Sequence, residues 1–119
     1  MDNNVFLNKL IMGTKQGKIL WADTAKNRNF LHYDYFAEKG DSFLALVQSQ
    51  EETTYGTFET CYTLSIFDSN FNCQYSFHQD DFKRNGADLI RLYRLVERNV
   101  NDVDSRMSQI VGDIEDLDF

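Results

Sequence analysis

The chain of 119 residues contains no proline, only two cysteines and two histidines, and one tryptophan. The absence of proline excludes a proline-rich linker and fits a regular domain of helices and strands. No apolar run approaches the ~20 residues that a transmembrane helix needs, and the start of the chain lacks the pattern of a signal peptide. We therefore expect a cytoplasmic protein whose residues 1–119 form a single domain.

Positive charge is also scarce, since 12 lysines and arginines stand against 19 acidic residues and give a formal net charge of -7. An acidic chain is a poor candidate for binding the phosphates of nucleic acids or an anionic membrane surface. Hydrophobic residues make up 42% of the chain, which argues against disorder. The composition thus predicts a folded domain without direct nucleic-acid or membrane binding. Its negative charge suits a basic protein partner or, as is more common, simply keeps the protein soluble.

Hydrophobic periodicity predicts an α+β fold, with a short N-terminal helix, a five-stranded antiparallel meander and a long C-terminal helix packed on one sheet face. The first helix is expected from about Asn4 to Gln16, with Gly17 as its terminating residue. The strands are expected at Lys18–Asp23, Phe30–Ala37, Ser42–Gln48, Thr57–Phe67 and Phe71–His78.

A two-residue loop at Ser69-Asn70 predicts the register of the last two strands. It places Ile66 opposite Cys73, and it aligns Leu64 with Tyr75 and Tyr62 with Phe77 on one buried face. This register predicts a buried Cys73. It turns Cys61 to the outer face, so that the two thiols cannot form a disulfide.

Catalytic and metal-binding motifs are missing from the chain. The cysteines and histidines lack the C-x-x-C or H-x-x-x-H spacing of a zinc site, and no glycine-rich phosphate loop is present. His78 falls opposite Cys61 in the predicted register, which is the minimum for a thiol nucleophile, but no third group is placed to orient the histidine. We expect no cofactor, no bound metal and no catalytic residue.

The outer face of the predicted sheet is mostly uncharged and carries aromatic side chains among small polar ones, a composition that suits protein contacts. His32 and Asp34 share this face, as half of a reactive site or as an ordinary surface pair. We regard the face as a second candidate surface, and its alternative use is as a small-ligand or thiol-enzyme site. Its defining residues are Phe30, His32, Phe36, Cys61, Phe67 and His78.

The C-terminal third carries an apolar stripe from Leu89 to Leu117 at a period of 3.5 residues. A helix from an N-cap at Asn85 to about Asp116 would be roughly 45 Å long, whereas the sheet would be only about 24 Å wide. The overhang predicts a surface for a homodimer or another protein partner, unless the helix breaks near Gly112 and folds back. The predicted partner-binding residues are Val103, Met107, Ile110, Val111, Ile114 and Leu117.

The end of the chain is strongly acidic and contains no base among its last residues. This order is unfavourable for the helix macrodipole, which prefers bases at a C-terminus. An alternative function follows, in which the acidic end occupies the basic surface of a nucleic-acid-binding host protein, as a phage-type inhibitor would. The residues of this acidic end are Asp113, Glu115, Asp116 and Asp118.

The first strand begins Gly17-Lys18-Ile19-Leu20-Trp21, and a meander and a long closing helix over Leu89–Val111 follow. This order of elements resembles small uncharacterised bacterial proteins of helix–antiparallel sheet–helix build, some of them encoded on phages or mobile elements. The resemblance covers most of the chain, but it rests on core positions. It therefore implies a fold and no site residues.

Overall fold

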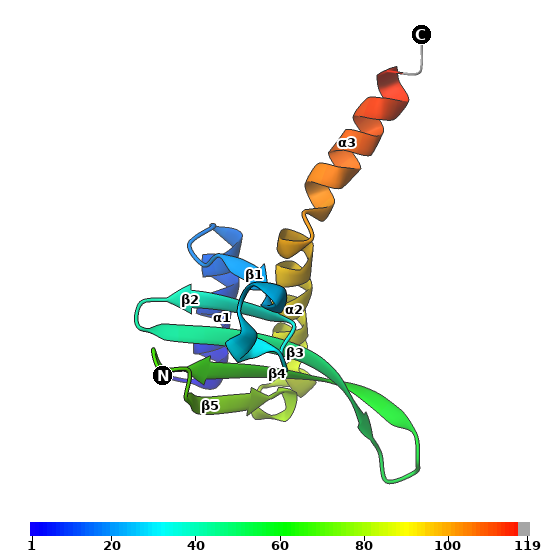
Figure 1. Ribbon diagram of the computed structural model, residues 1–119. Helices are drawn as coiled ribbons and strands as arrows, with labels where there is room; N and C mark the ends of the chain where they lie inside the picture. The colour runs from blue at the N-terminus through cyan, green and yellow to red at the C-terminus, as the bar shows by residue number, and fades with distance from the viewer. Residues whose placement is uncertain (117–119) are drawn as a thin grey trace.

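Five antiparallel strands form one sheet in chain order, with two helices packed against one face (Figure 1). The computed structural model describes residues 1–116. The strands are β1 (Trp21–Asp23), β2 (Tyr35–Lys39), β3 (Ser42–Glu52), β4 (Phe58–Phe67) and β5 (Cys73–His78). The α-helices are α1 (Asn3–Lys15), α2 (Ala87–Val100) and α3 (Val103–Asp116). The predicted α+β class, with its antiparallel meander, is confirmed.

The main core lies between the sheet and the pair α1 and α2. Helix α1 begins where the Asp2 carboxylate accepts a hydrogen bond from the Asn4 backbone N–H at 2.7 Å, as an N-cap should. Burying one leucine side chain contributes about 1.5–3 kcal/mol, so this layer supplies much of the driving force for folding. Its fully enclosed members include Leu7, Leu46, Leu64, Leu89, Leu92 and Val96.

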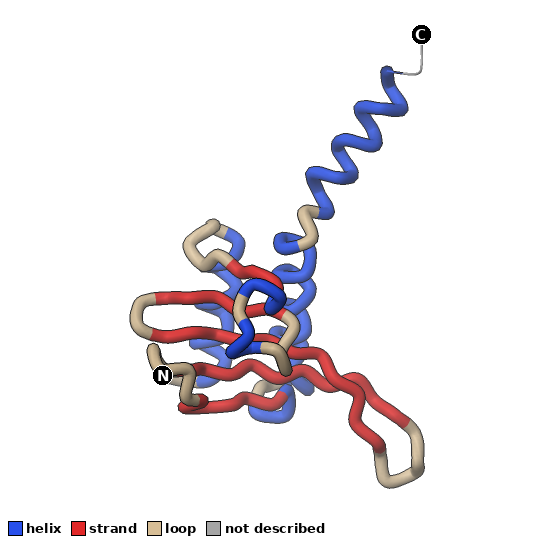
Figure 2. The backbone as a smooth tube through the Cα atoms, in the orientation of Figure 1, coloured by secondary structure: helices blue, strands red, loops and turns tan. Residues whose placement is uncertain are grey.

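A second, smaller core covers the opposite sheet face. The connection between β1 and β2 forms two 3₁₀ turns, η1 (Thr24–Lys26) and η2 (Arg28–Phe30), which Figure 2 shows as short helical pieces. They begin at Asp23 and Asn27, whose side chains cap the following backbone N–H groups. As a result, the second strand begins at Tyr35 instead of the predicted Phe30. The first strand begins at Trp21 instead of Lys18, because the backbone N–H groups of Lys18 and Ile19 donate to the Gly13 carbonyl in the turn that ends α1.

Strands β3 and β4 continue past their neighbours as a two-stranded arm, defined here as residues 50–60 (Figure 1). The prediction that the third strand ends at Gln48 was wrong, because the ladder continues to the pair Glu52 and Phe58. The arm is polar along most of its length, but Tyr55 is 92% exposed and Phe58 69% exposed. Several of its side chains bond to one another, as Gln50 does when it donates to Thr60 at 2.9 Å.

The predicted register of β4 and β5 was also wrong, by two residues. Leu64 pairs with Phe77 and Ile66 with Tyr75, and a bulge follows Ile66. The loop is longer than two residues, because the Asp68 carboxylate accepts hydrogen bonds from the backbone N–H groups of Asn70 and Asn72. Cys73 consequently pairs with Phe67 and is exposed, not buried in the core.

Helix α2 begins differently from the prediction that Asn85 caps it. Two further 3₁₀ turns, η3 (Gln79–Asp81) and η4 (Arg84–Gly86), precede the helix, and Asn85 has a left-handed φ of 54°. The N-cap residue is Gly86, with a φ of 75°. A Cβ at this position would lie 2.6 Å from the Cβ of Gln79, so only glycine fits the approach of the chain to η3.

The expected single helix of the last third is broken into α2 and α3. Asp102, between them, has a left-handed φ of 52°, a conformation that aspartate tolerates better than most residues. Its carbonyl then accepts a hydrogen bond from the Arg106 N–H at 3.1 Å, which starts α3. Gly112, where a break was considered, lies inside α3. No helix within residues 1–116 is long and apolar enough to cross a membrane.

Candidate functional site

Helix α3 projects away from the body of the protein, as Figure 1 shows. The predicted overhang of the C-terminal segment is therefore present, although it begins after a break. Met107, Ile110, Val111 and Ile114 expose between 52% and 61% of their surface, and Val103 at the break is half-buried. Leu117, the last predicted member, lies outside the described residues. Their role in binding a partner stays a prediction.

The exposed apolar residues of α3 lie on one face of the helix. Positions 103, 107, 110 and 114 alternate in steps of four and three, and Val111 widens the stripe beside Met107 and Ile114. A helix of 14 residues is marginal in water by itself, because helix nucleation is costly. An exposed stripe on such a helix is typical of a surface that another chain covers.

Charges flank the α3 stripe in a definite order. Arg106 lies beside the stripe in the first half of α3, and Asp113 lies on the same flank in the last turn. Asp113 and Glu115 are exposed, and no base is present in that turn. The side chain of Asp116 and the whole of Asp118 lie outside the described part of the chain. Since the C-terminal macrodipole disfavours acids, an approaching base would stabilise the helix end.

An exposed ion pair spans the break between the helices. Arg98 of α2 donates a hydrogen bond to Asp104 of α3 at 2.6 Å, and both side chains are more than half exposed. Such a pair contributes at most about 1 kcal/mol, so it biases the direction of α3 without fixing it rigidly.

The second candidate surface is largely closed. Phe30, from η2, is fully buried and its ring lies 5.1 Å from those of Phe36 and Phe67. Cys61 is also fully buried, whereas His32 is exposed in a turn outside any strand. The prediction of an open recognition face was wrong, because the β1–β2 connection covers it. Asp23 and Asn27, which cap η1 and η2, are the sequence signal for that cover.

Asp34 does not form a surface pair with His32. Its carboxylate accepts hydrogen bonds from the Tyr93 hydroxyl at 2.8 Å and from the Gln48 backbone N–H at 2.9 Å. Burial, and then the contact with Asp34, raises the pKa of Tyr93 above its ordinary value of 10.0. Asp34 is therefore a structural link between β3 and α2, which sequence reasoning missed because the partners are distant along the chain.

Cys61 and His78 do lie close together, although not in the predicted register. His78 pairs with Thr63 across the β4–β5 ladder. One donor atom each from Glu51, Cys61 and His78 lies within 4.8 Å of the others. Burial, followed by the hydrogen bond and charge of Glu51, raises the pKa of the Cys61 thiol to about 11. Because a thiol nucleophile needs a lowered pKa, this environment does not activate Cys61.

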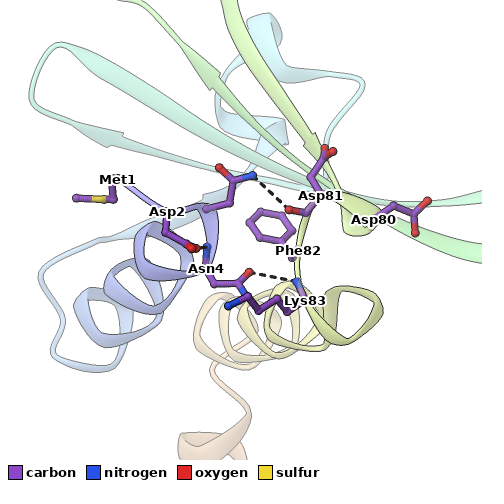
Figure 3. A pocket seen from close by; sticks show the side chains of 8 residues that line it. Met1, Asp2, Asn4, Asp80, Asp81, Phe82 and Lys83 are labelled. Atoms are coloured by element: carbon purple, nitrogen blue, oxygen red, sulfur yellow. Dashed lines mark hydrogen bonds between the residues drawn. The ribbon is translucent and has the colours of Figure 1, made fainter.

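A hollow of about 330 Å³ lies where the start of α1 meets the segment before α2 (Figure 3). Its polar groups are largely occupied by contacts within the protein. The Asn3 side chain donates to the Asp81 carbonyl at 3.2 Å, and the Asn4 side-chain oxygen accepts from the Lys83 N–H at 3.3 Å. The hollow thus marks a junction that fixes α1 against η3.

The fold and surfaces define an α+β domain with a one-sided helical layer and a projecting amphipathic helix. No protein-family model matches the chain, and neither curated proteins nor solved structures give a match. Inferences about function therefore rest on the geometry of this chain alone.

Proposed function

We propose that this protein is a non-enzymatic interaction module that self-associates through α3. The proposal rests on one observation, which is the exposed apolar stripe on a helix that projects away from the body of the protein. Pairing two such helices would remove both stripes from water and would stabilise helices that are marginal alone. A cytoplasmic location is part of the proposal, and the two free thiols support it because reducing compartments preserve thiols.

The charges on α3 favour an antiparallel arrangement of the two copies. With Met107 packed against Ile110 of the second copy, the stripe pairs throughout, and Arg106 approaches Asp113 of that copy. The two-fold symmetry produces this opposite-charge pair twice. A parallel arrangement would place Arg106 near Val111 and would lose both pairs. The interface is small, so we expect a weak dimer that forms with rising concentration.

A second candidate function uses the same helix against a different protein. Exposed Asp113 and Glu115, in a turn without bases, would suit a basic surface such as that of a nucleic-acid-binding protein. This is the inhibitor hypothesis. It predicts a monomer by itself and a loss of target binding when the acidic residues of the last turns are changed to amides.

Size exclusion with light scattering at several concentrations tests self-association. The wild-type protein should shift from monomer to dimer as concentration rises. I110E should stay monomeric, because it places a charge in the stripe at an already exposed position. The matched control is M12E on α1, where an equally exposed apolar residue is changed outside the proposed interface. A wild type that is monomeric at every concentration would refute self-association and leave the second candidate.

A charge exchange tests the antiparallel arrangement. R106E should weaken the dimer several-fold, since it places two carboxylates side by side twice per dimer. The double variant R106E/D113R should restore the affinity, because each copy then offers the reversed pair. Failure of the double variant to recover would exclude this antiparallel register while leaving self-association itself intact.

A further inference from the structure

A cluster of three metal-ligand side chains lies where the β3–β4 arm joins the body. Glu51 comes from β3, Cys61 from β4 and His78 from the end of β5, and their donor atoms lie within 4.8 Å of one another. The imidazole Nε2 of His78 is 3.7 Å from a carboxylate oxygen of Glu51. Nothing in the α3 interface uses these residues.

The spacing fits a tetrahedral zinc ion with small adjustments. Zinc bonds of ~2.3 Å to sulfur and ~2.0–2.2 Å to nitrogen and oxygen place neighbouring ligands roughly 3.3–3.6 Å apart. Since the donors lie within 4.8 Å of one another, they must close by about 1.5 Å at most. Glu51 and His78 can supply that movement, because their side chains are 55% and 34% exposed. The same exposure gives the ion a path to the buried thiol.

The other nitrogen of His78 has a carboxylate beside it. The Nδ1 atom lies 3.3 Å from a carboxylate oxygen of Asp80. Zinc-bound histidines usually donate their second ring N–H to a carboxylate, carbonyl or water, which fixes the tautomer and the ring orientation. In the structure without metal, Nδ1 accepts a long hydrogen bond of 3.4 Å from the Asp80 backbone N–H. If Nε2 binds the metal, Nδ1 carries the ring proton, gives up that bond and donates to the Asp80 carboxylate instead.

The surrounding charge favours a cation. Glu51 and Glu59 are directly paired across β3 and β4, an arrangement of like charges that destabilises a ladder. A carboxylate oxygen of Glu59 also lies 3.9 Å from the Cys61 sulfur. Within residues 1–116, no lysine or arginine forms an ion pair with Glu51, Glu59 or Asp80. A divalent cation would relieve this local excess of negative charge.

We propose that Glu51, Cys61 and His78 form a binding site for one zinc ion, with Asp80 orienting His78 and water completing the coordination. Thiolate, imidazole and carboxylate together suit zinc better than magnesium or calcium, which prefer oxygen ligands. On binding, the Cys61 thiol transfers its proton to solvent and the sulfur bonds to the metal. The ion links β3, β4 and β5 at the base of the arm and holds the arm in one direction.

Cobalt titration of the full, reduced chain tests the site, because cobalt takes the same ligands and is coloured. We expect one ion per chain and a sulfur-to-cobalt charge-transfer band, with zinc displacing cobalt. C61S should lose the band, and E51Q and H78A should each weaken binding at least tenfold. E51Q changes an exposed side chain and so leaves the fold intact, which keeps the test decisive even if C61S fails to fold.

The chain offers matched controls, since C73S and H32A remove the other thiol and the other imidazole. Both should bind cobalt and zinc like the wild type. The proposal is overturned if the wild type gives no charge-transfer band, if E51Q and H78A bind with wild-type affinity, or if C73S removes the band. Circular dichroism of every variant checks that the fold is retained.

Discussion

The Asp34 side chain links the sheet to α2. Its carboxylate accepts one hydrogen bond from the α2 side chain of Tyr93 and one from the backbone of β3. A charged acceptor makes such bonds stronger than neutral ones, and partial burial protects them from water. The pair of Asp34 and Tyr93 thus fixes how α2 sits on the sheet.

Removing the Tyr93 hydroxyl should therefore be costly. Y93F is expected to lower the free energy of unfolding by about 1.5–3 kcal/mol, because it removes one of the two donors to the Asp34 carboxylate and leaves only the Gln48 N–H. Urea unfolding followed by circular dichroism measures the change. The control Y55F alters a tyrosine that is 92% exposed and should change stability by less than about 0.5 kcal/mol. Equal effects of the two variants would contradict the assigned role of Asp34.

Stability should also fall at alkaline pH because of Tyr93. The pKa of this hydroxyl is raised in the folded protein by burial and by Asp34, whereas an unfolded tyrosine ionises near 10.0. The folded state then retains a proton that the unfolded state loses, so the stabilisation is full below pH 10 and declines above it. In unfolding measured from pH 8 to 11, the loss should be smaller for Y93F. Parallel curves for the two proteins would contradict this linkage.

Two glycines of the C-terminal helices have opposite conformational requirements. Gly86 has a left-handed φ and no room for a Cβ, whereas Gly112 lies in a helix with nothing within 4 Å of its Cβ position. G86A should lower the free energy of unfolding by about 1–3 kcal/mol because of the strain. G112A should increase the helicity of α3, since alanine is favoured over glycine by about 1 kcal/mol in a helix.

Urea unfolding and far-ultraviolet circular dichroism distinguish the two variants. G112A should also strengthen the proposed dimer, because less helix must be ordered on association. A G86A variant of unchanged stability would contradict the left-handed backbone at the start of α2. A destabilising G112A variant would contradict the helical conformation of α3.

The elements also show what periodicity can and cannot predict. The alternation along β4 identified the inward face correctly, because side-chain direction in a strand depends only on the period of two. The register with β5 was missed, since it depends on the hydrogen bonds that Asp68 makes in the loop. The 3.5-residue period continues across Asn101 and Asp102, so the apolar pattern could not reveal the break between α2 and α3.

Among the candidate sites, the sequence predicted the features that follow from a regular pattern and missed those that depend on irregular or distant segments. The exposed stripe on α3 follows from the length of the helical pattern and the width of the sheet. The outer face of the sheet is covered by Phe30. This residue lies in the irregular connection between β1 and β2, a kind of segment that helix and strand propensities predict poorly. Glu51 was missed because the third strand was expected to end before it. Contacts between distant segments, such as that of Asp34 with Tyr93, have no local signal.

The whole molecule consists of a body that contains the cores, an arm and a projecting helix. Within residues 1–115, whose burial the structure describes, no buried residue lies beyond Val96, and Val100 is the last apolar residue packed against the main core. The interaction surface is thus separate from the residues that determine stability. Changes in α3 should alter association without unfolding the protein.

Truncation after Asn101 tests this separation. The shortened chain should keep its free energy of unfolding within about 1 kcal/mol, because it loses the exposed pair of Arg98 with Asp104 and the half-buried side chain of Val103, but no core residue. Light scattering should find it monomeric at concentrations where the full chain dimerises. A loss of several kcal/mol on truncation would mean that α3 packs on the body and is not a separate element.

The position of the break has a consequence for synthesis on the ribosome. All residues of the main core precede Asn101, so they leave the ribosome before any residue of α3. Synthesis proceeds from the N-terminus, and the segments that precede α3 can begin to associate first. The apolar stripe of α3 is therefore exposed later than the segments that form the core, which reduces its opportunity to compete for core positions.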